Sequence, residues 1–578
     1  MTTIPHRLFA QGAALGSAAA YHQKIDGAWV ATDWQTYAAS TRQVARALIG
    51  LGLQPDGRVC ILSFNRPEWV LVDVGCMAAG GVAAGIYETC SAEEVAYILR
   101  HSQARIAFVE SASQWEKIAE HRESLPDLEA VVTFAGVPPI ADALVMSWAE
   151  FLAVADGVED GAVQVRLDGL KPDAPATFIY TSGTTGPPKA VMLSHSNLAW
   201  TAEAAIGLVG LGPTDSTVSY LPLSHIAEQM FTILAPITAG SQVYYAESRE
   251  TMAENIVEVQ PTVFLGVPRV WEKMHAKIST GLQGAPPMKK RIAGWAMGVG
   301  QRVNGLRNRG ASPGLLLRIQ YRLARRLVYD KARPKFGMGR VRVAVTGAAP
   351  IAPEIIDFFA GLDLQIHEVY GQSEDCGPTS FNRPGATKIG TVGPAIPGVK
   401  IKIAKDGEIL VSGPNVFLGY YKDQAATDEA LIDGWLHSGD LGELDADGFL
   451  SITGRKKDII ITAGGKNIAP KNIEAALKNL TLVSQAVVIG DRRKFLSALI
   501  TLDPETDARH DDPAVLAEIQ KGVDSVNARF ARVEHIRKFT ILPRDFDVEN
   551  KELTPTLKVK RRIVDENWAD AIEAMYAG

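Results

Sequence analysis

The sequence predicts an α/β fold in which parallel sheets are covered by helices, followed by a smaller α+β part at the C-terminal end. Short apolar runs such as 59–62 alternate with stretches of helical periodicity such as 34–51, and this alternation is typical of parallel sheets covered on both faces. With 578 residues, the chain exceeds one ordinary core. A charged break at 454–458 ends a β pattern, which places the division between the two parts there.

Composition and charge indicate an ordinary globular protein. Apolar residues make up 47% and charged residues 21% of the chain. The net charge of −6 gives no sign of general affinity for nucleic acid, so we expect no nucleic-acid partner. The N-terminus lacks the charge and apolar core of a secretion signal. The run 70–86 is short and interrupted by Asp73, which favours a buried helix and strand over a membrane span.

The four cysteines predict the compartment. Cys60, Cys76, Cys90 and Cys376 lack the spacing of metal ligands. They are typical of reduced, mostly buried thiols, and we therefore expect a cytoplasmic protein.

Local patterns predict the N-terminal elements one by one. Apolar spacing predicts a helix over 34–51 that Gly52 and Pro55 end. Asn65 is expected to cap the next helix, which has Pro67 near its first turn. The remaining predicted elements are strands at 59–62, 82–86, 106–109 and 176–180, and helices at 92–101 and from 198 onward.

The stretch from Tyr180 to His195 reads YTSGTTGPPKAVMLSH and is predicted to form an anion-binding loop between a strand and a helix. Its small residues leave backbone N–H groups uncovered, and Gly183 and Gly186 can take backbone angles closed to other residues. Successive exposed N–H groups bind anions, and Lys189 adds a positive charge. The glycine spacing is not that of the Walker loop. By itself, this composition leaves a flexible polar linker as an alternative.

Three later strings add groups that suit a nucleotide. A predicted strand over 341–347 ends in small residues, which would let a flat base lie against the backbone. Tyr370, in HEVYGQSE, offers an aromatic face, and Glu374 offers a hard oxygen ligand for Mg²⁺. A hairpin is predicted over 401–411 around Asp-Gly. It precedes WLHSGD, which ends at Asp440.

In combination and order, these strings resemble the motifs of the adenylate-forming enzymes, which include acyl-CoA synthetases, luciferases and peptide-synthetase adenylation domains. The resemblance extends from about residue 30 to 565. SYLPLSHIAEQ at 219–229, FLGVPRVW at 264–271 and LTPTLKVKRR at 553–562 are similar to the long-chain fatty acyl-CoA synthetase branch. Ala190 and Leu557 depart from the pattern, because many relatives have glycine there.

The resemblance implies two domains and a role for each motif. A large N-terminal adenylate-forming domain would span 1–454, and a small mobile C-terminal domain would span 455–578. The implied catalytic residues are Lys558, Thr184 and Glu374, with Lys560 as the alternative to Lys558, and Thr184 and Glu374 would hold Mg²⁺. The implied ATP and AMP ligands are Thr181, Ser182, Gly183, Thr185, Gly186, Lys189, Gly347, Ala348, Ala349, Tyr370, Gly371, Gln372, Ser373, Asp440 and Arg455. The hinge would be Lys457. The CoA ligands would be Gly464, Gly465 and Lys466, and the acyl pocket would be lined by His225, Val267 and Pro268.

The implied activity is that of a fatty acid–CoA ligase, with Mg²⁺ as cofactor and ATP and CoA as co-substrates. Three alternatives stay open from the sequence: an acyl-AMP ligase that loads a carrier protein, a ligase for aryl or sterol-side-chain acids, and a non-catalytic lipid-binding protein with a dead nucleotide site. The length of the acyl chain and the oligomeric state are not specified by the motifs.

Residues 288–340 are strongly basic, with Asp330 nearly the only acid. Within this region, 315–327 is a plausible basic amphipathic helix. One interpretation is a solvated helix packed on the main body. The other is a peripheral contact with anionic membrane lipid or with the phosphates of CoA.

Overall fold

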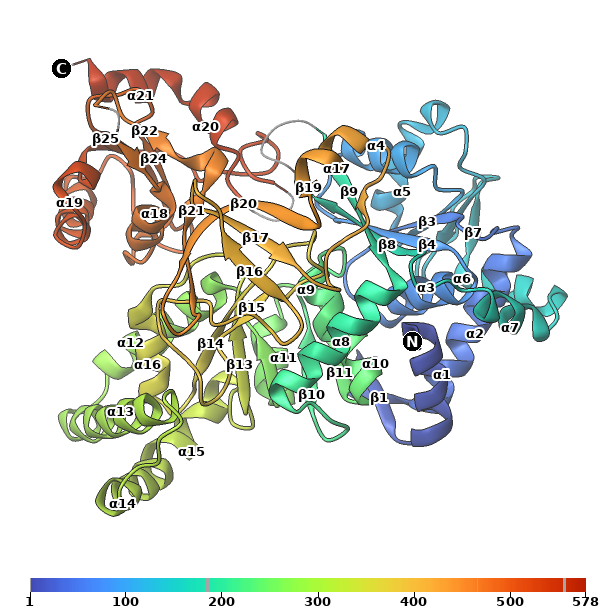
Figure 1. Ribbon diagram of the computed structural model, residues 1–578, viewed down its shortest axis with the longest axis horizontal. Coiled ribbons are helices and arrows are strands. Elements are labelled where there is room, and N and C mark those ends of the chain that lie inside the picture. Colours follow the sequence, from blue (N-terminus) through green and yellow to red (C-terminus); the bar gives the residue numbers. More distant parts are fainter. Residues whose placement is uncertain (1, 182–186, 465, 555–557, 578) are drawn as a thin grey trace.

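The computed structural model describes residues 2–181, 187–464, 466–554 and 558–577, and Figure 1 shows a large body with a smaller C-terminal part beside it. The largest sheet has eight strands in the order β18-β9-β8-β4-β3-β5-β6-β7. Their bounds are β3 Arg58–Leu62, β4 Val82–Ile86, β5 Ile106–Val109, β6 Ala130–Thr133, β7 Val145–Ser147, β8 Pro175–Thr181, β9 Lys189–Ser194 and β18 Gly419–Tyr420. The six strands from β8 to β7 are parallel, while β9 and β18 run antiparallel to their neighbours.

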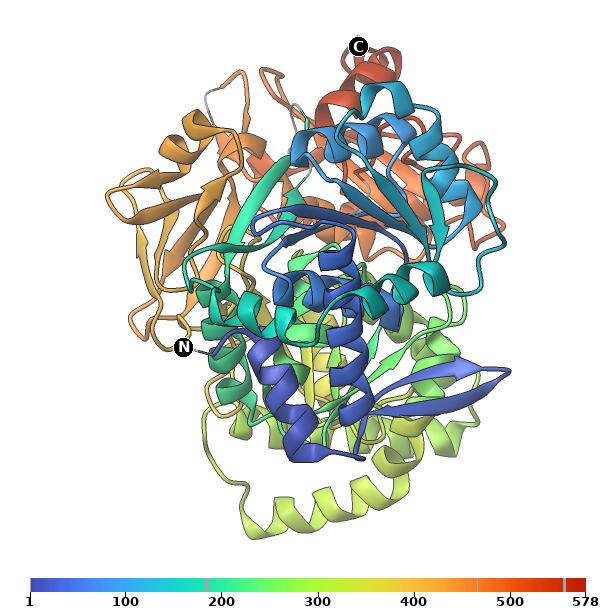
Figure 2. The same cartoon turned by 90° about the vertical axis from the view of Figure 1, so that its right-hand side faces the viewer.

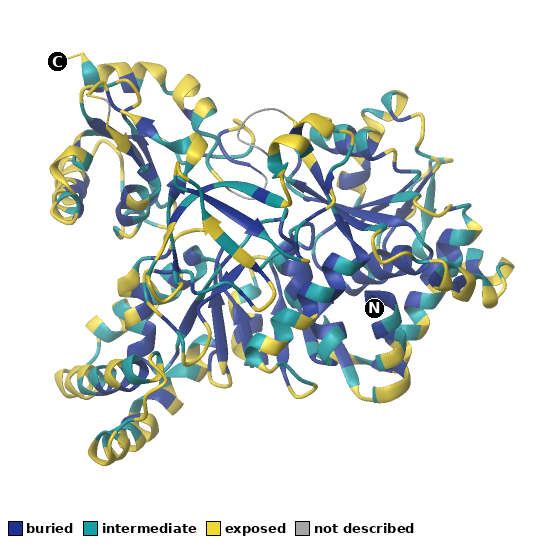
Figure 3. Ribbon diagram, viewed as in Figure 1, coloured by how far each residue is buried: buried dark blue, intermediate teal, exposed yellow. Residues whose placement is uncertain are grey.

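Helices cover both faces of this sheet, as the alternating pattern predicts. The helices α2 (Trp34–Gly50) and α3 (Pro67–Ala78) pack with Val59 and Ile61 in one core. The helices α4 (Ala92–Ser102) and α5 (Ala112–Ala119) pack with the alternate residues Cys60 and Leu62 in another. Successive side chains of a strand point to opposite faces, so β3 feeds both cores and is buried along most of its length (Figure 3).

Two smaller sheets complete the centre of the body. One has the order β10-β11-β1-β2, and the other has the order β12-β13-β14-β15. Their bounds are β1 Ala19–Ile25, β2 Ala28–Asp33, β10 Ser216–Ser219, β11 Gln242–Tyr245, β12 Val263–Leu265, β13 Val343–Thr346, β14 Ile366–Tyr370 and β15 Ser380–Phe381. The helices of this region are α1 Ile4–Leu15, α8 His195–Val209, α9 Ile226–Gln229, α10 Ala235–Ala239, α11 Met252–Val259, α12 Pro268–Gln283 and α16 Pro353–Gly361. In each sheet the final strand pair is antiparallel and the others are parallel.

A five-stranded antiparallel sheet connects the body to the C-terminal part. It has the order β16-β17-β20-β19, and β21 also pairs with β20. The bounds are β16 Lys400–Ile403, β17 Glu408–Ser412, β19 Leu431–Ile432, β20 Trp435–Leu444 and β21 Leu450–Arg455, and α17 (Gln424–Ala430) precedes β19. The predicted hairpin is confirmed, with Gly407 at its turn in the left-handed region (φ 87°). The strand β21 includes Arg455, one residue past the predicted division of the chain.

The C-terminal part has hydrophobic cores of its own. Two clusters of buried residues are formed only by side chains from Ile460 onward. They enclose the sheet β24-β25-β26 and the helices around it. The bounds are β22 Ile460–Ile461, β23 Asn467–Ile468, β24 Val483–Ile489, β25 Leu496–Leu502, β26 Ile536–Ile541, α18 Pro470–Lys478, α19 Pro513–Asn527, α20 Arg561–Asn567 and α21 Ala569–Tyr576. The α+β character expected for this part is confirmed, and the domain boundary at 454/455 stays a prediction.

A helical hairpin projects from the body. It consists of α13 (Pro287–Arg307) and α14 (Leu315–Ala324), and π-helical residues Arg325–Tyr329 follow α14. Figures 1 and 2 both show it at the margin of the molecule, away from the C-terminal part. Among the described residues, no helix has the length and apolar character that a bilayer span requires.

Two local predictions were wrong. The expected order of strand, loop and helix is wrong, because residues 189–194 form a second strand, β9, which pairs with β8 and precedes the helix α8. Asn65 does not cap α3, whose cap residue is Arg66. The side chain of Asn65 instead forms hydrogen bonds with the backbone of Leu221 and Leu223, in a distant segment of the chain.

Candidate active site

The predicted site residues gather where strands end. The glycine-rich loop follows β8, Val267 and Pro268 follow β12, Gly347 follows β13, and Gly371 follows β14. The strands β12, β13 and β14 are parallel neighbours, so their carboxyl ends meet along one edge, which is where ligands bind in open α/β sheets. The topology therefore brings together the three motifs at the ends of β12, β13 and β14, between Val267 and Gly371 in the chain.

Close packing accounts for two glycines at this edge. A Cβ atom on Gly347 would lie 2.6 Å from Cγ1 of Val369. One on Gly371 would lie 1.4 Å from the carbonyl oxygen of Gly377. Ala348 is exposed and takes a left-handed conformation (φ 69°), and Ala349 is exposed beside it. An open, small-residue surface thus lies next to the strand ends, as a site for a flat base would require.

Asp440 is the centre of a buried hydrogen-bond network. The hydroxyl of Tyr370 donates to Oδ2 of Asp440 at 3.0 Å, and Nε2 of Gln372 donates to the same oxygen at 2.6 Å. Nε of Arg455 donates to Oδ1 at 2.7 Å. The bulge at Gly439 (φ 70°) within β20 turns this carboxylate toward the other strands. Four predicted nucleotide ligands are therefore connected by hydrogen bonds, although Asp440 and Arg455 lie in strings separate from the one that holds Tyr370 and Gln372.

The backbone after Tyr370 is held by a second carboxylate. Oδ1 of Asp375 accepts from the backbone N–H of Gln372 at 2.6 Å, and Oδ2 accepts from the hydroxyl of Thr379 at 2.5 Å. Burial raises the pKa of Asp375 to about 8. This side chain fixes the strand exit on which Gln372 and the buried Ser373 lie.

Glu374 faces the strand that carries Tyr420. The Tyr420 hydroxyl donates to Oε1 of Glu374 at 2.8 Å. The ammonium of Lys189 lies 5.0 Å from the Tyr420 ring centre and 3.6 Å from a carboxylate oxygen of Asp423. One carboxylate oxygen of Glu374, a hard donor of the type that Mg²⁺ prefers, thus accepts a hydrogen bond close to the lysine of the glycine-rich loop.

Lys558 lies within electrostatic range of these groups. Its side chain is exposed at the surface of the site, while protein atoms crowd its ammonium group. This crowding lowers the pKa of Lys558 to about 8; the charges of Arg455 and Lys471 lower it further, whereas Asp440 and Glu374 raise it. A lysine near the C-terminus is thus brought to carboxylates more than a hundred residues earlier. Lys560, the alternative, precedes α20.

His225 is the N-cap residue of α9. Its Nδ1 accepts from the backbone N–H of Ala227 at 3.1 Å. Burial lowers the pKa of His225 to about 3, and the charge of Lys558 lowers it further, so the imidazole is neutral at physiological pH. Val267 and Pro268 lie at the start of α12. Their assignment to an acyl pocket stays a prediction.

A buried polar network supports the segment before His225. Nδ2 of Asn65 donates to the Leu221 carbonyl at 2.6 Å, and the N–H of Leu223 donates to Oδ1 of Asn65 at 3.2 Å. Glu228 accepts from the hydroxyl of Thr232 at 2.6 Å, and burial raises the pKa of Glu228 to about 7. These contacts connect the largest sheet to the loop that carries His225.

The predicted hinge and CoA residues lie on exposed turns. Lys457 is exposed in the turn 456–458, next to Lys456, whose ammonium lies 2.7 Å from Asp406 and 3.1 Å from Glu408. Gly464 and Lys466 are exposed in the β22–β23 hairpin. Thr181 ends β8 beside Lys189 of β9. The roles assigned to these residues stay predictions.

Several predicted residues lie outside the described part of the chain. They are Ser182, Gly183, Thr184, Thr185 and Gly186 of the loop, and Gly465 of the hairpin. In the described residues there is no group of three or more His, Cys, Asp or Glu side chains able to hold a metal ion.

Sequence reasoning missed Tyr420, Asp423 and Lys471. The hydroxyl of Tyr420 donates to Glu374, and Asp423 pairs with Lys189. Lys471 pairs with Asp458 at 3.5 Å, and its charge lowers the pKa of Lys558. None of the three lies in one of the predicted motifs. Tyr420 and Asp423 reach the site because β18 pairs with β9, and Lys471 reaches it on α18. No local sequence pattern indicates either arrangement.

Comparison with known proteins identifies the wider group. The family model described as AMP-binding enzyme matches residues 8–421, and the model described as AMP-binding enzyme C-terminal domain matches residues 457–578. Among curated proteins, the long-chain-fatty-acid–CoA ligase ACSBG2 of Gallus gallus is 38% identical over 99% of this chain and 81% of its own. The long-chain-fatty-acid–CoA ligase FadD15 of Mycobacterium tuberculosis is 40% identical over 96% of this chain and 94% of its own.

Solved structures share the fold. The anthranilate CoA ligase AuaEII, in complex with anthranoyl-AMP, has a TM-score of 0.76 at 19% identity, covering 99% of this chain and 98% of its own. ATP-bound MatB from Rhodopseudomonas palustris has a TM-score of 0.72 at 22% identity, covering 99% of this chain and 100% of its own. At these identities the likeness extends to the fold alone.

Proposed function

Because the chain belongs to the AMP-binding enzyme family, we propose that it is a long-chain fatty acid–CoA ligase. It activates a fatty acid with ATP to acyl-AMP and pyrophosphate, and then transfers the acyl group to CoA. The full-length relatives at 38% and 40% identity carry this activity in their names. The observation that carries the mechanism is the network in which Tyr370, Gln372 and Arg455 donate to Asp440, with Lys558 within electrostatic range of that carboxylate.

The first half-reaction forms the mixed anhydride. A carboxylate oxygen of the fatty acid forms a bond to the α-phosphorus of ATP, the bond from that phosphorus to the bridging oxygen breaks, and pyrophosphate leaves. All reacting groups are anionic, so catalysis consists mainly of positioning and charge stabilisation. Lys558 stabilises the charge that develops on the α-phosphate and the entering carboxylate. Ser182, Thr185 and Lys189 hold the departing phosphates.

The adenosine would lie along the edge formed by β13 and β14. Gly347, Ala348 and Ala349 would face the base together with Tyr370, and Asp440 would accept from the ribose hydroxyls. A carboxylate has about four lone-pair sites, and Tyr370, Gln372 and Arg455 already donate three hydrogen bonds to Asp440. Binding both ribose hydroxyls therefore requires one of these donors to move.

Glu374 and Thr184 are the proposed ligands of Mg²⁺. The chemistry of Glu374 fits, since one carboxylate oxygen accepts from Tyr420 and the carboxylate can still offer its other oxygen. Mg²⁺ is commonly bound by one or two carboxylates together with substrate phosphates, which suits a site with few protein ligands. When bound, the ion would supply positive charge to the phosphate oxygens.

The second half-reaction uses another orientation of the small domain. The thiol of CoA attacks the acyl carbon, a carbon–sulfur bond forms, and the bond to the phosphate oxygen of AMP breaks. Rotation near Lys457 would withdraw Lys558 and bring the hairpin with Gly464, Gly465 and Lys466 to the site.

The four cysteines of the chain, all free and buried, fit the proposed cytoplasmic location.

ATP–pyrophosphate exchange tests the proposal. We expect exchange with long-chain fatty acids, rising with acyl length, and formation of acyl-CoA when CoA is added. Exchange without thioester formation would instead indicate a ligase that loads a carrier protein. Preference for an aryl or sterol-side-chain acid would indicate another substrate class. Absence of pyrophosphate release with every acid would contradict the enzymatic proposal.

A further inference from the structure

The outer face of α14 is apolar and uncovered. Leu316, Ile319, Leu323 and Leu327 recur at intervals of three and four residues, which places them on one side of a helix. Together with Leu315, they are 43–77% exposed. Seven of the seventeen large apolar side chains exposed in the described residues lie within 288–327, including Met288 and Ile292 of α13. This concentration distinguishes the hairpin from scattered surface leucines.

A second apolar face of α14 is already used for folding. Leu317, Tyr321 and Val328 pack against Val299 and Val303 of α13 in a small core. The exposed leucines are therefore not needed to hold α14 on the hairpin. Within the described residues, no segment covers them.

Positive charge borders the apolar face. Arg318, Arg322 and Arg326 recur four residues apart, and none of them forms an ion pair with a residue that the structure describes. Residues 288–340 hold fourteen lysines and arginines and only one acid, Asp330, in a chain whose net charge is −6. The charge surplus is thus local to the hairpin and its continuation.

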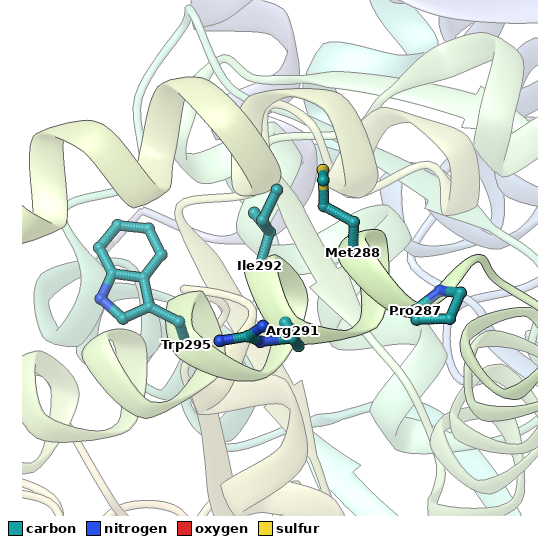
Figure 4. A pocket seen from close by; sticks show the side chains of 5 residues that line it. All are labelled: Pro287, Met288, Arg291, Ile292 and Trp295. Atoms are coloured by element: carbon teal, nitrogen blue, oxygen red, sulfur yellow. The ribbon is translucent and has the colours of Figure 1, made fainter.

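The neighbouring helix adds a shallow apolar hollow of about 560 Å³. It is lined by Pro287, Met288, Arg291, Ile292 and Trp295 at the start of α13, and Figure 4 shows these side chains along that helix. Met288 is 75% exposed, and Lys289, Lys290 and Arg291 are exposed beside it. The same combination of exposed apolar and basic side chains therefore continues from α14 to α13.

We propose that the outer face of the α13–α14 hairpin binds the surface of an anionic lipid bilayer, with its leucines in the interface and its arginines on the lipid phosphates. A helix with an apolar face bordered by basic residues lies in the interfacial plane of such a membrane, and each basic residue near the surface strengthens binding by about fivefold. An anionic bilayer accounts for both the apolar and the basic side chains, because its interior is apolar and its headgroups are negatively charged. The hairpin projects from the margin of the molecule (Figure 2), so it can reach a flat surface.

This inference is independent of catalysis, since binding is measured without ATP or fatty acid. Purified full-length protein would be sedimented with vesicles of phosphatidylcholine alone, or of phosphatidylcholine mixed with phosphatidylglycerol, at low and at high salt. We expect binding to the anionic vesicles that weakens as salt rises. No binding to anionic vesicles at low salt would overturn the proposal, and so would equal binding to neutral ones.

Two double variants separate the apolar and the charged contributions to vesicle binding. The double variant Leu316→Ser with Leu323→Ser should lower the partition coefficient between vesicles and solution at least tenfold, at low and at high salt. Arg322→Gln with Arg326→Gln should lower it roughly twenty-five-fold at low salt and much less at high salt. ATP–pyrophosphate exchange should be unchanged in both variants, because none of these residues lies in the proposed site, and this confirms that they fold.

Matched controls carry equally exposed changes elsewhere. Val165→Ser on α7 (Gly161–Asp168) removes an apolar side chain that is 72% exposed, and Arg492→Gln removes a charge whose side chain is 93% exposed. Both controls should bind vesicles like the wild type. Equal losses in controls and variants would contradict the assigned face. The oligomeric state of the wild type and of the leucine variant should also be compared. If the wild type is a dimer and the double variant Leu316→Ser with Leu323→Ser is a monomer, a second copy of the chain covers this face, and the proposal is overturned.

Discussion

Lys558 lies within electrostatic range of charges of both signs, the cations Arg455 and Lys471 and the carboxylates Asp440 and Glu374. An ammonium group in such a position can respond to an anionic ligand, because binding ATP adds negative charge to the same site. The proximity of Lys558 to these groups is a structural observation, whereas its catalytic role stays a proposal.

Replacing Lys558 should separate the two half-reactions. Lys558→Ala is expected to slow acyl-AMP formation by roughly 10²–10³-fold, the usual effect of losing one group that stabilises transition-state charge. Thioester formation from added acyl-AMP should be retained, because the proposed second step does not use this lysine. Both rates can be measured separately by pyrophosphate release and by acyl-CoA formation. Lys560→Ala is the matched control and should leave both rates close to wild type. Equal loss of both half-reactions in a folded Lys558→Ala protein would contradict the assignment.

The pH dependence of adenylation should report the same lysine. Its folded-state pKa of about 8 is below the ordinary value of 10.5, so the ammonium is charged below pH 8 and loses its proton as pH rises through that value. We expect kcat/KM for acyl-AMP formation to fall on the alkaline side near pH 8, because this parameter reports groups of the free enzyme. In Lys558→Arg, any remaining activity should lack this fall, since a guanidinium stays charged. An alkaline limb unchanged in Lys558→Arg would assign the titration to another group.

At the scale of elements, the site depends on how strands end. The exit of β14 carries Tyr370, Gly371 and Gln372, and its backbone is fixed by Asp375. The chain passes so close to Gly377 that no side chain fits at Gly371. The glycine in this motif is therefore explained by packing as well as by a possible ligand.

Substituting this glycine should affect the whole element. Gly371→Ala would place a methyl group 1.4 Å from the Gly377 carbonyl oxygen, so the backbone must shift. We expect a loss of at least about 1–3 kcal/mol in unfolding free energy, as for overpacked cores, with a lower Tm in thermal denaturation. Gly207→Ala in α8 is the control, because a Cβ there meets no atom within 4 Å. It should be neutral or stabilising, since alanine favours helix. Equal melting temperatures for the two variants would contradict this packing.

Sequence patterns predicted most elements of the large sheet and failed where pairing is distant. The strands at 59–62, 82–86 and 106–109 were found because apolar runs between helices are local signals. The strand β9 was missed, although it pairs with the neighbouring β8, because residues 189–194 were included in the predicted glycine-rich loop. Its second partner, β18, lies more than 200 residues later in the chain. Asn65 was assigned to a cap by its position, but its side chain bonds across the core to Leu221.

At the scale of the whole molecule, ion pairs hold the small domain where Lys558 approaches the site. Arg269 of α12 lies 2.8 Å from Asp503, and Lys273 lies 2.6 Å from Glu505. Arg529 pairs with Glu354 of α16. The acidic side chains after β25 thus face the basic side of α12. If the small domain rotates as proposed for the second half-reaction, we expect these pairs to break.

Reversing one pair should change the balance between the half-reactions. Glu505→Lys places two positive charges together at Lys273, and we expect acyl-AMP formation to slow about two- to fivefold, the size of an exposed ion pair. Thioester formation from added acyl-AMP should not slow. The double variant Glu505→Lys with Lys273→Glu should restore the adenylation rate, while Asp511→Lys, an exposed change on the same domain, should have no effect. Failure of the charge swap to restore the rate would show that this pair does not hold the orientation.

The types of chemical group and their order in the chain are properties of the sequence alone. It contains a hydroxyl-rich glycine loop, an aromatic–glycine–glutamate string, an aspartate turn and a terminal lysine, each of which local patterns or resemblance could identify. The amphipathic character of 315–327 was equally readable, because periodicity along a helix reports which side chains share a face.

Only the tertiary structure decided which of these groups meet and what covers each face. It brought Arg455, Gln372 and Tyr370 to Asp440, and Tyr420 to Glu374. It also left the leucines of α14 uncovered, where the sequence allowed them to pack on the body. The physical reason is that periodicity specifies that a face must be buried or bound, whereas the partner comes from segments hundreds of residues away whose pairing has no local signal.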